Sequence, residues 1–265
     1  MGTKKRKRHR RGTIKKSTAK RLISNLILVV AIIIFIISAY KLIGIGSGYM
    51  KGRSEYEEVM DLAVEYEEDT EKFRVDFNQL MIMNSDTIGW IRFYPEPSII
   101  NYPVVQGNDN DLYLHKTFSA NENTLGAIFM DMNCSSDFSD RHSIIYGHRM
   151  KDGSMFRKLE DYKDKSFWEE NPYFYIYTPD GKEITYHIYS VGVVKDDADT
   201  YTLSFADDAD FQTFIDYTLS TADYETGVNV NTDSQIVTLS TCTASSDEHR
   251  FVVHGVKIRE SYLED

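Results

Sequence analysis

The longest apolar stretch of the chain lies close to its start. Residues Leu22–Tyr40 contain no charged side chain, and Leu26–Ile37 are all apolar. A helix of these residues would be about 28 Å long, roughly the thickness of the hydrocarbon core of a membrane. The pattern therefore predicts a transmembrane helix over residues 22–41. A cleaved signal peptide is the alternative, but its apolar region is usually shorter, and Ser38-Ala39-Tyr40 is a poor cleavage site.

A short flexible joint and an acidic helix are predicted after this segment. Three glycines and a serine between residues 44 and 48 favour the joint. Residues Ser54–Glu71 are rich in acidic residues and have apolar residues at helical spacing. Ser54 and Glu57 are placed as a capping box at the start of this helix. We assign residues 42–76 to the joint and the acidic helix together.

From Trp90 onward the apolar pattern alternates with a period of two, which is typical of strands. Two helices interrupt this pattern at Ser154–Tyr162 and Asp207–Ser220, the second with Phe211, Phe214, Ile215 and Leu219 on one face. Many short strands with few helices predict a mainly β fold, a closed or nearly closed mixed barrel of eight strands. The eight predicted strands are Gly89–Phe93, Ile99–Val105, Ala127–Met130, Ser143–Tyr146, Phe174–Thr178, Glu183–Val194, Gln235–Ser240 and Phe251–Ile258.

Charge is distributed unevenly along the chain, whose formal net charge is −11. Residues 1–21 carry 11 basic and no acidic side chains, whereas the remainder carries 19 basic and 41 acidic ones. A basic segment beside an apolar helix predicts a single-pass protein of the cell membrane with its N-terminus in the cytoplasm. The basic segment could also be a nucleic-acid patch, but attraction to anionic lipid headgroups explains its position better, and the acidic remainder is a poor match for phosphates. We therefore expect no nucleic-acid partner, a basic cytoplasmic segment over 1–21 and an extracellular domain over 77–265.

The chain has two cysteines, Cys134 and Cys242, which excludes a disulfide-rich scaffold and a cysteine-based zinc cluster. Acidic and polar residues alternate over Asp131–Asp137 like the start of a calcium-binding loop. However, Ser136 and His142 stand where such a loop needs its glycine and its final glutamate. We expect no metal and no cofactor.

Candidate chemistry lies at the ends of two predicted strands. Cys242 follows the apolar strand Gln235–Ser240 within a polar run, where its thiol would be partly exposed. His148 follows the strand Ser143–Tyr146. Most lone cysteines are small buried apolar residues, and His148 could be an ordinary surface imidazole. A cysteine and histidine pair would instead provide a nucleophile and a proton carrier.

Arg250 opens the last predicted strand, eight residues after Cys242. It could be a simple cation at the edge of a strand. If a hairpin returns beside the strand of Cys242, the guanidinium will lie near the sulfur. It cannot act as a base there, but it can stabilise a thiolate and a developing oxyanion.

These residues resemble the sortases, membrane-anchored cysteine transpeptidases of Gram-positive bacteria. The resemblance rests on Thr238-Leu239-Ser240-Thr241-Cys242, on Tyr146-Gly147-His148 and on Arg250 before a valine-rich strand. It extends over about Phe77–Ile258 and is similar to class B in the segments Ile88–Ile91, Asn101–Gly107, Tyr113–Leu114, Gly126–Asp131, Tyr146–Phe156 and Asp207–Ser220. The resemblance implies an eight-stranded sortase barrel with N-terminal helices and a helix before the catalytic strand. The chain departs from class B at Thr243, where an acidic residue is frequent.

The resemblance also implies a mechanism and partners. Cys242 would attack the threonine carbonyl of a sorting signal in a surface protein, NPxTx-like or related, and form a thioacyl-enzyme. His148 would carry protons, and Arg250 would hold the oxyanion. An amine of peptidoglycan or of a lipid-linked precursor would then accept the acyl group. Substrate-binding residues carried over by motif position are Asn110, Leu114, Tyr146, Ser240 and Tyr201.

Two other functions remain compatible with the sequence. A membrane-tethered cysteine peptidase would use the same groups but would transfer the acyl group to water. A non-catalytic surface binding module is the second alternative, and a disulfide between Cys134 and Cys242 would support it. Because Cys134 lies in a polar loop, we expect it to be a free thiol.

Overall fold

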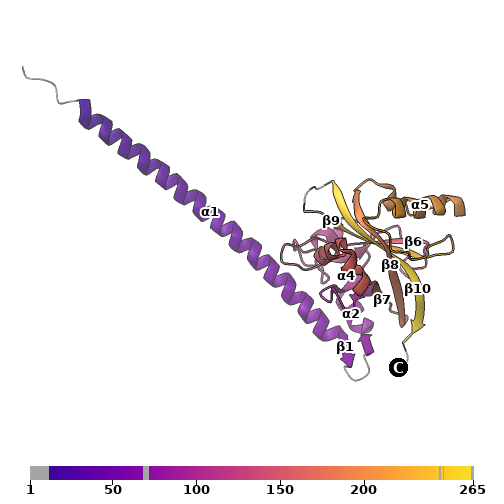
Figure 1. The fold of residues 1–265 in the computed structure, drawn as a ribbon. Coiled ribbons are helices and arrows are strands. Elements are labelled where there is room, and N and C mark those ends of the chain that lie inside the picture. The colour runs from indigo at the N-terminus through magenta and orange to yellow at the C-terminus, as the bar shows by residue number, and fades with distance from the viewer. Residues whose placement is uncertain (1–11, 68–71, 245, 247, 264–265) are drawn as a thin grey trace, which may run out of the picture. The chain divides into compact units, whose positions relative to one another are not determined.

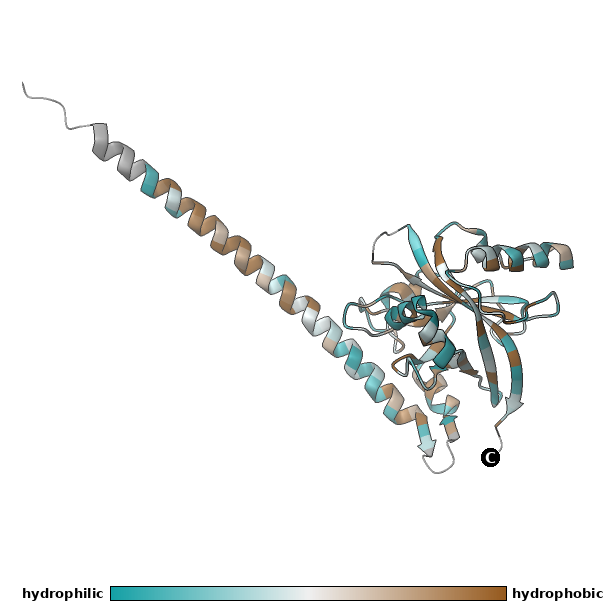
Figure 2. Cartoon of the chain, in the orientation of Figure 1, coloured by the Kyte–Doolittle hydropathy of each residue, from teal (hydrophilic) through white to brown (hydrophobic). Residues whose placement is uncertain are grey.

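The computed structural model describes residues 12–67, 72–244, 246 and 248–263. Its contacts divide the chain into one unit that ends at Met50 and a second that begins at Lys51. The described part of the first unit lies in helix α1 (Gly12–Ala63), and the leucine, isoleucine, valine and phenylalanine side chains of residues 22–45 are exposed. Figure 2 colours most of this stretch as hydrophobic. The stretch from Lys20 is long and apolar enough to cross a membrane. A single N-terminal candidate for a membrane anchor is therefore present among the described residues.

The predicted glycine joint and the predicted capping box are wrong. Helix α1 continues through Gly44–Gly48, so these glycines do not form a joint. A glycine costs a helix only about 1 kcal/mol relative to alanine, which is too little to end one that helix-forming residues extend on both sides. Ser54 consequently lies inside α1 and does not cap it.

The acidic helix ends at Ala63, before the predicted Glu71. Val64–Glu67 (β1) pairs with Lys72–Val75 (β2) in an antiparallel hairpin, and residues 68–71 lie outside the described residues. Valine and aromatic residues favour strands, and they alternate with charged residues in both segments. The guanidinium of Arg92 lies over the ring of Phe73 at 4.2 Å from its centroid, which ties the hairpin to the barrel.

The remaining strands form the predicted closed barrel (Figure 1). Their order around it is β10-β8-β7-β3-β4-β5-β6-β9. Neighbours are antiparallel except in the pairs β4–β5 and β6–β9, which are parallel. All eight predicted strands are confirmed, with the bounds β3 (Thr87–Phe93), β4 (Asn101–Val105), β5 (Ile128–Met130), β6 (His142–Tyr146), β7 (Tyr173–Tyr177), β8 (Lys182–Lys195), β9 (Ile236–Cys242) and β10 (His249–Tyr262).

Both predicted helices within the barrel sequence are present. The first is the 3₁₀ helix η1 (Phe156–Lys163), and the second is α5 (Asp208–Ser220), capped by the side chain of Asp207. Leu219 does not lie on the buried face of α5, because it is 45% exposed and Thr218 is buried there instead. The short helices that the pattern did not predict are α2 (Phe77–Met83), α3 (Leu112–His115), α4 (Lys165–Glu170) and η2 (Asp199–Tyr201).

One face of the β6–β9–β10 sheet extends from the apolar core to the ends of the strands. Side chains on a strand alternate between faces, and directly paired residues share a face. Ile236 and Val256 are paired and pack with buried residues of α5. Further along the same face come Thr238, Ser240 and finally Cys242. The face is therefore apolar where α5 covers it and polar where it reaches the open end.

Candidate active site

Cys242 is the last residue of β9, and it lies directly opposite Arg250 of β10. The hairpin expected from the sequence is therefore present, and both side chains point to the same face of the sheet. Cys242 is partly exposed, whereas Thr241 before it is buried. The thiol thus lies where the strand leaves the core, as its polar neighbours predicted.

His148 lies at the same end of the neighbouring strand. In the parallel pair β6–β9, Tyr146 is registered with Ser240, and His148 and Cys242 each follow two residues later. The backbone N–H of Gly147 donates to the carbonyl of Ser240 at 3.1 Å, which continues this alignment beyond the last registered pair. The topology therefore brings Cys242, Arg250 and His148 to one edge of three adjacent strands.

The orientation of the His148 ring follows from its hydrogen bond. Its Nε2 lies 2.8 Å from the carbonyl oxygen of Leu114. A carbonyl can only accept, so Nε2 carries the proton and Nδ1 of the neutral ring is left to accept one. Gly126 has φ +61°, and a Cβ there would lie 2.7 Å from the ring of His148. This position therefore requires glycine.

The Arg250 guanidinium is held from two sides. It donates to the carbonyl of His249 at 3.1 Å and pairs with the carboxylate of Asp196 at 3.5 Å. Asp196 directly follows β8, and its backbone N–H donates to the carbonyl of Glu248 at 3.0 Å. Sequence reasoning missed Asp196, because only the β8–β10 pairing brings it close to Arg250.

A cleft of about 320 Å³ opens beside Asp196 and Arg250, and Cys242 and His148 are not among the residues that line it. Four of the five predicted substrate-binding residues line it, and Phe129, Asp196 and Arg250 complete the lining. The fifth, Ser240, lies behind Tyr201, and their hydroxyls are 2.9 Å apart. The lining residues predicted from the sequence are Asn110, Leu114, Tyr146 and Tyr201.

The pKa of Tyr201 reflects its position near Arg250, Asp196 and Cys242. Burial raises the pKa of Tyr201, while the hydrogen bond to Ser240 and the charge of Arg250 act in the opposite direction. Electrostatic interactions with Asp196 and Cys242 add to the effect of burial on the pKa of Tyr201. All of these groups are therefore close enough to act electrostatically on one phenol.

Asp131 supports two of the residues that line the cleft. Its carboxylate accepts hydrogen bonds from the amide of Asn110 at 2.8 Å and from the hydroxyl of Tyr146 at 3.1 Å. It also accepts from the backbone N–H of Asn133 at 2.9 Å. The acidic and polar alternation noted in the sequence thus serves hydrogen bonds that fix two residues of the cleft.

Cys134 is free, as predicted, and so is Cys242, so the disulfide that would have supported a binding module is not formed. Cys134 is 7% exposed, and burial raises the pKa of its thiol to about 12. A thiol in that state is a poor nucleophile at neutral pH. The two cysteines therefore differ in their capacity for chemistry.

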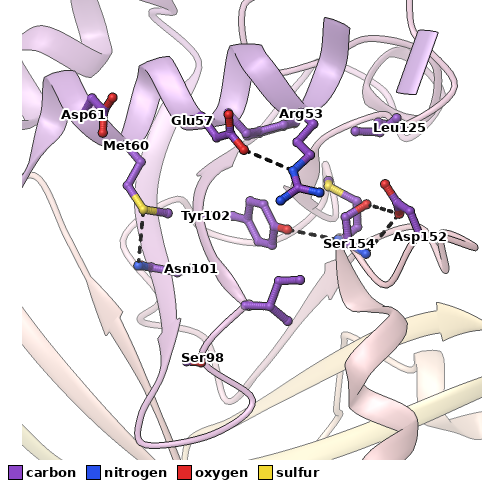
Figure 3. Close-up of a pocket in the computed structure, with 13 residues that line it drawn as sticks. Arg53, Glu57, Met60, Asp61, Ser98, Asn101, Tyr102, Leu125, Asp152 and Ser154 are labelled. Atoms are coloured by element: carbon purple, nitrogen blue, oxygen red, sulfur yellow. Dashed lines mark hydrogen bonds and ion pairs between the residues drawn. The ribbon is translucent and has the colours of Figure 1, made fainter. Parts of the chain in front are cut away.

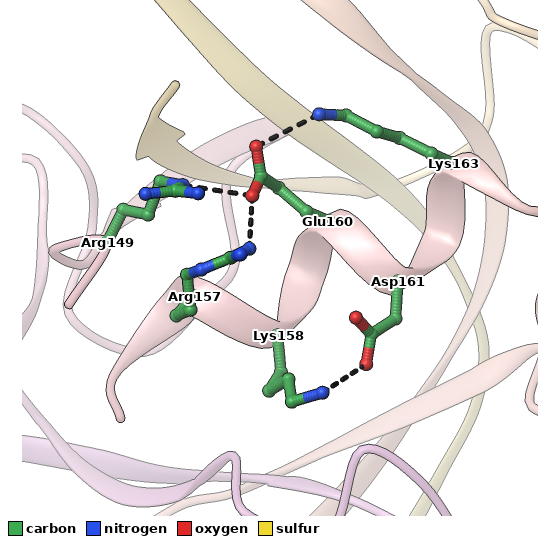
Figure 4. Close-up of polar contacts among 6 residues, drawn as sticks. All are labelled: Arg149, Arg157, Lys158, Glu160, Asp161 and Lys163. Atoms are coloured by element: carbon green, nitrogen blue, oxygen red, sulfur yellow. Dashed lines mark hydrogen bonds and ion pairs between the residues drawn. The ribbon is translucent and has the colours of Figure 1, made fainter. Parts of the chain in front are cut away.

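The segment after His148 is fixed by an ion-pair cluster (Figure 4). Glu160 of η1 pairs with Arg149 at 2.9 Å, with Lys163 at 2.9 Å and with Arg157. Although burial opposes ionisation, the hydrogen bonds from Lys163 and Arg149 hold the pKa of Glu160 below its usual value. Glu160 therefore anchors the residue next to His148.

A second cavity, of about 310 Å³, lies between the last turns of α1 and the β3–β4 connection (Figure 3). Arg53 and Glu57 form an ion pair in its wall, and Tyr102 accepts a hydrogen bond from the backbone N–H of Met155. The residues that line this cavity include none of the predicted catalytic residues. Asp152, Ser154 and Met155 in its wall belong to the segment that follows His148.

Comparisons with known proteins agree with this site. The sortase domain family model matches residues 95–258. Sortase B of Listeria monocytogenes is 33% identical over 186 residues, which are 69% of this chain and 74% of that protein. Sortase B of Staphylococcus aureus is 33% identical over 240 residues, 89% of this chain and 95% of that protein.

Solved structures give the same result. A Staphylococcus aureus sortase B–substrate complex matches with a TM-score of 0.64 and 32% identity, over 69% of this chain and 84% of that one. A sortase B structure complexed with triglycine matches with the same TM-score and identity, over 69% of this chain and 85% of that one. The barrel, the paired strand ends and the similarity along the chain lead to one conclusion: the protein belongs to the class B sortases, the cysteine transpeptidases of that family.

Proposed function

We propose that Cys242 is the nucleophile of a two-step acyl transfer. Its thiolate adds to the carbonyl carbon of threonine in a sorting signal, and the tetrahedral intermediate expels the amine of the following residue. The product is a thioester between Cys242 and the substrate. An acceptor amine then attacks the thioester, forms a new amide and releases the thiolate. The observation that carries this proposal is the register pairing of Cys242 with Arg250, with His148 at the end of the adjacent parallel strand.

His148 carries the proton in both steps. The leaving amine must be protonated as the C–N bond breaks, and the incoming amine must lose a proton as its bond forms. Because Nε2 is bound to the carbonyl of Leu114, Nδ1 is the nitrogen that exchanges the proton. The proton that Nδ1 gives to the leaving amine in the first step is replaced by the proton that it takes from the acceptor amine in the second.

Arg250 stabilises the charge that develops on the carbonyl oxygen. Its guanidinium lines the cleft and offers several N–H donors in a fixed plane. The carboxylate of Asp196 and the carbonyl of His249 restrain the guanidinium, so it is oriented before the substrate binds. Pre-oriented donors stabilise a transition state more than donors that must reorganise.

The cleft binds the residues of the sorting signal that precede the cleaved bond. Asn110, Leu114, Tyr146 and Tyr201 line this cleft, and Ser240 is hydrogen-bonded to Tyr201. A relative has been solved in complex with substrate and another structure with triglycine, which supports a peptide donor and an amine acceptor for this chain. The acceptor is an amine of peptidoglycan or of its lipid-linked precursor.

The protein is anchored through the apolar part of α1. The 11 basic residues before it remain in the cytoplasm, and the barrel lies outside the cell. This orientation places the cleft on the side of the membrane where surface proteins and wall precursors are exposed.

The test is an incubation of the full chain, in detergent, with peptides of the NPxTx and LPxTG types, with and without triglycine. We expect a thioacyl-enzyme with at least one peptide and a ligated product when triglycine is added. If the products are the same hydrolysed peptide in both conditions, the enzyme is a peptidase and the transfer proposed here is wrong.

A further inference from the structure

Two buried histidines and a threonine form a hydrogen-bonded row on the sheet face that leads to Cys242. Thr238 of β9 lies directly opposite His254 of β10, and their side chains are 2.8 Å apart. On the other side, Nε2 of His142 from β6 lies 2.7 Å from the Thr238 hydroxyl. All three side chains are at most 1% exposed. Three strands are therefore joined side by side through one hydroxyl.

The direction of these hydrogen bonds is fixed by their far end. Nδ1 of His142 lies 2.7 Å from the carbonyl oxygen of Thr202, and a carbonyl can only accept. In the neutral ring the proton is thus on Nδ1, and Nε2 must accept from the Thr238 hydroxyl. That hydroxyl has one proton, so it accepts in turn from Nδ1 of His254.

Both rings are neutral at the pH at which cells grow. Burial lowers the pKa of His142 to about 4 and that of His254 to about 3. The hydrogen bond to Thr202 and the charges of Asp131 and Asp140 raise the pKa of His142 and so oppose the effect of burial. The ring of His142 also packs on Phe214 of α5, with 4.5 Å between the ring centroids. Each ring therefore carries a single proton, as the directions of the hydrogen bonds require.

The row ends on the segment that forms a wall of the cleft. Thr202 directly follows Tyr201, whose hydroxyl lies 2.9 Å from that of Ser240. Thr238 and Ser240 are alternate residues of β9, so they share a face with Cys242. Side chains on this face therefore bind two consecutive residues of the segment. Thr202 is bound through His142, and Tyr201 is bound by Ser240. Cys242 lies further along the same face.

We infer that His142 and Thr238 are positioning residues that hold Tyr201 against the substrate cleft, with His254 fixing the hydroxyl of Thr238. The inference rests on the proposed function, because it assumes that Tyr201 contacts the sorting signal. Hydrogen bonding across the row sets the position of the Tyr201 backbone, and the bond to Ser240 sets the position of its ring. The row contacts neither substrate nor reacting atoms and acts on peptide binding.

A matched pair of substitutions at Thr238 tests this role in the full chain. Thr238→Val keeps the shape of the side chain but removes the hydroxyl, whereas Thr238→Ser keeps the hydroxyl. We expect Thr238→Val to raise the KM for the best sorting-signal peptide by about 3–10-fold, the range of one net hydrogen bond, with kcat within about twofold. Thr238→Ser should restore KM to within about twofold of the wild-type value.

Two further measurements separate positioning from general stability. The rate at which iodoacetamide alkylates Cys242 should be unchanged in Thr238→Val, since the nucleophile is not displaced. The KM effects of Thr238→Val and Tyr201→Phe should be less than additive, because both loosen the same segment. If Thr238→Val does not fold, His142→Asn replaces it, because asparagine can still donate to Thr202 but cannot reach Thr238.

The outcomes distinguish the possible failures. The positioning role would be overturned if a folded Thr238→Val protein had an unchanged KM. It would also be overturned if kcat fell by the same factor in Thr238→Val and Thr238→Ser. Additive effects with Tyr201→Phe would overturn it as well. A wild-type enzyme that forms no thioacyl adduct with any peptide would instead contradict the proposed function.

Discussion

The two cysteines of this protein occupy opposite environments. Cys242 is the last residue of its strand, at one end of the barrel, where it is partly exposed and lies opposite Arg250. Cys134 lies in the connection between β5 and β6, where its side chain is buried and its thiol has a pKa raised to about 12. Both belong to short polar runs of sequence, so local composition does not distinguish them.

The difference between the two cysteines follows from their positions in the barrel. The regular pairing of β6, β9 and β10 brings three functional groups to the same end of these strands, whereas Cys134 lies in the loop between β5 and β6, outside this pairing. Asp131 and Asp140 act on Cys134 instead, and both raise its pKa further. Burial and nearby carboxylates therefore disfavour the thiolate of Cys134, whereas Cys242 is partly exposed and lies opposite Arg250.

Alkylation should show the largest contrast. At pH 8 the Cys134 thiol is almost entirely protonated, because burial raises its pKa to about 12. We expect iodoacetamide to modify Cys242 in the folded full chain and to leave Cys134 unmodified, as measured by peptide mass mapping. Since the thiolate is the reactive form, modification of Cys134 should rise with pH toward 12. Equal labelling at pH 8 would remove the contrast.

His148→Ala should reduce transpeptidation by about 10²–10⁴-fold, the usual contribution of a positioned acid or base. The amine would then leave without a proton donor, although Cys242 and its neighbours are intact. The measurement is the rate of thioacyl-enzyme formation with a sorting-signal peptide. His115→Ala is the control, because that histidine is exposed on α3 and bonds to no group of the cleft among the contacts described. Equal rates for both variants would exclude His148 from catalysis.

Arg250→Lys should cost about 10²–10³-fold in kcat, the typical loss for one oxyanion donor. Lysine keeps the charge but lacks the planar set of donors, so it cannot reproduce the directed contact. Steady-state kinetics on the same peptide measures the loss. A rate close to wild type would mean that a diffuse positive charge is enough beside Cys242.

Cys134→Ala should have the smallest effect, with kcat/KM within about twofold of wild type. The thiol is buried outside the cleft, so its removal changes packing and no step of the reaction. Kinetics on the matched peptide, together with a melting curve, will report this. A large loss of activity without loss of stability would assign a function to the second cysteine.

The features that the sequence predicted well are those with local causes. The apolar helix and all eight strands follow from periodicity, and the polar run around Cys242 marks the end of its strand. The errors arise where the segments on either side of a stretch decide its structure. Helix α1 continues through Gly44–Gly48 because both flanks are helical, and Val64–Glu67 becomes a strand because it pairs with Lys72–Val75.

The same division applies to the site. The catalytic candidates were identified from a sequence motif and strand ends, and the structure brings them to one edge. Asp196 could not be found this way, because its contact with Arg250 depends on the β8–β10 pairing. The row of His142, Thr238 and His254 likewise depends on the register of three strands.

The central claim is that Cys242 alone forms the covalent link to the substrate. The most direct measurement is peptide mass mapping of the full chain after incubation with a reactive sorting-signal peptide in the absence of an acceptor amine. We predict a thioacyl group on Cys242 in the wild type and in Cys134→Ala, and no covalent adduct in Cys242→Ala. An acyl group on Cys134, or an adduct that persists in Cys242→Ala, would contradict the account.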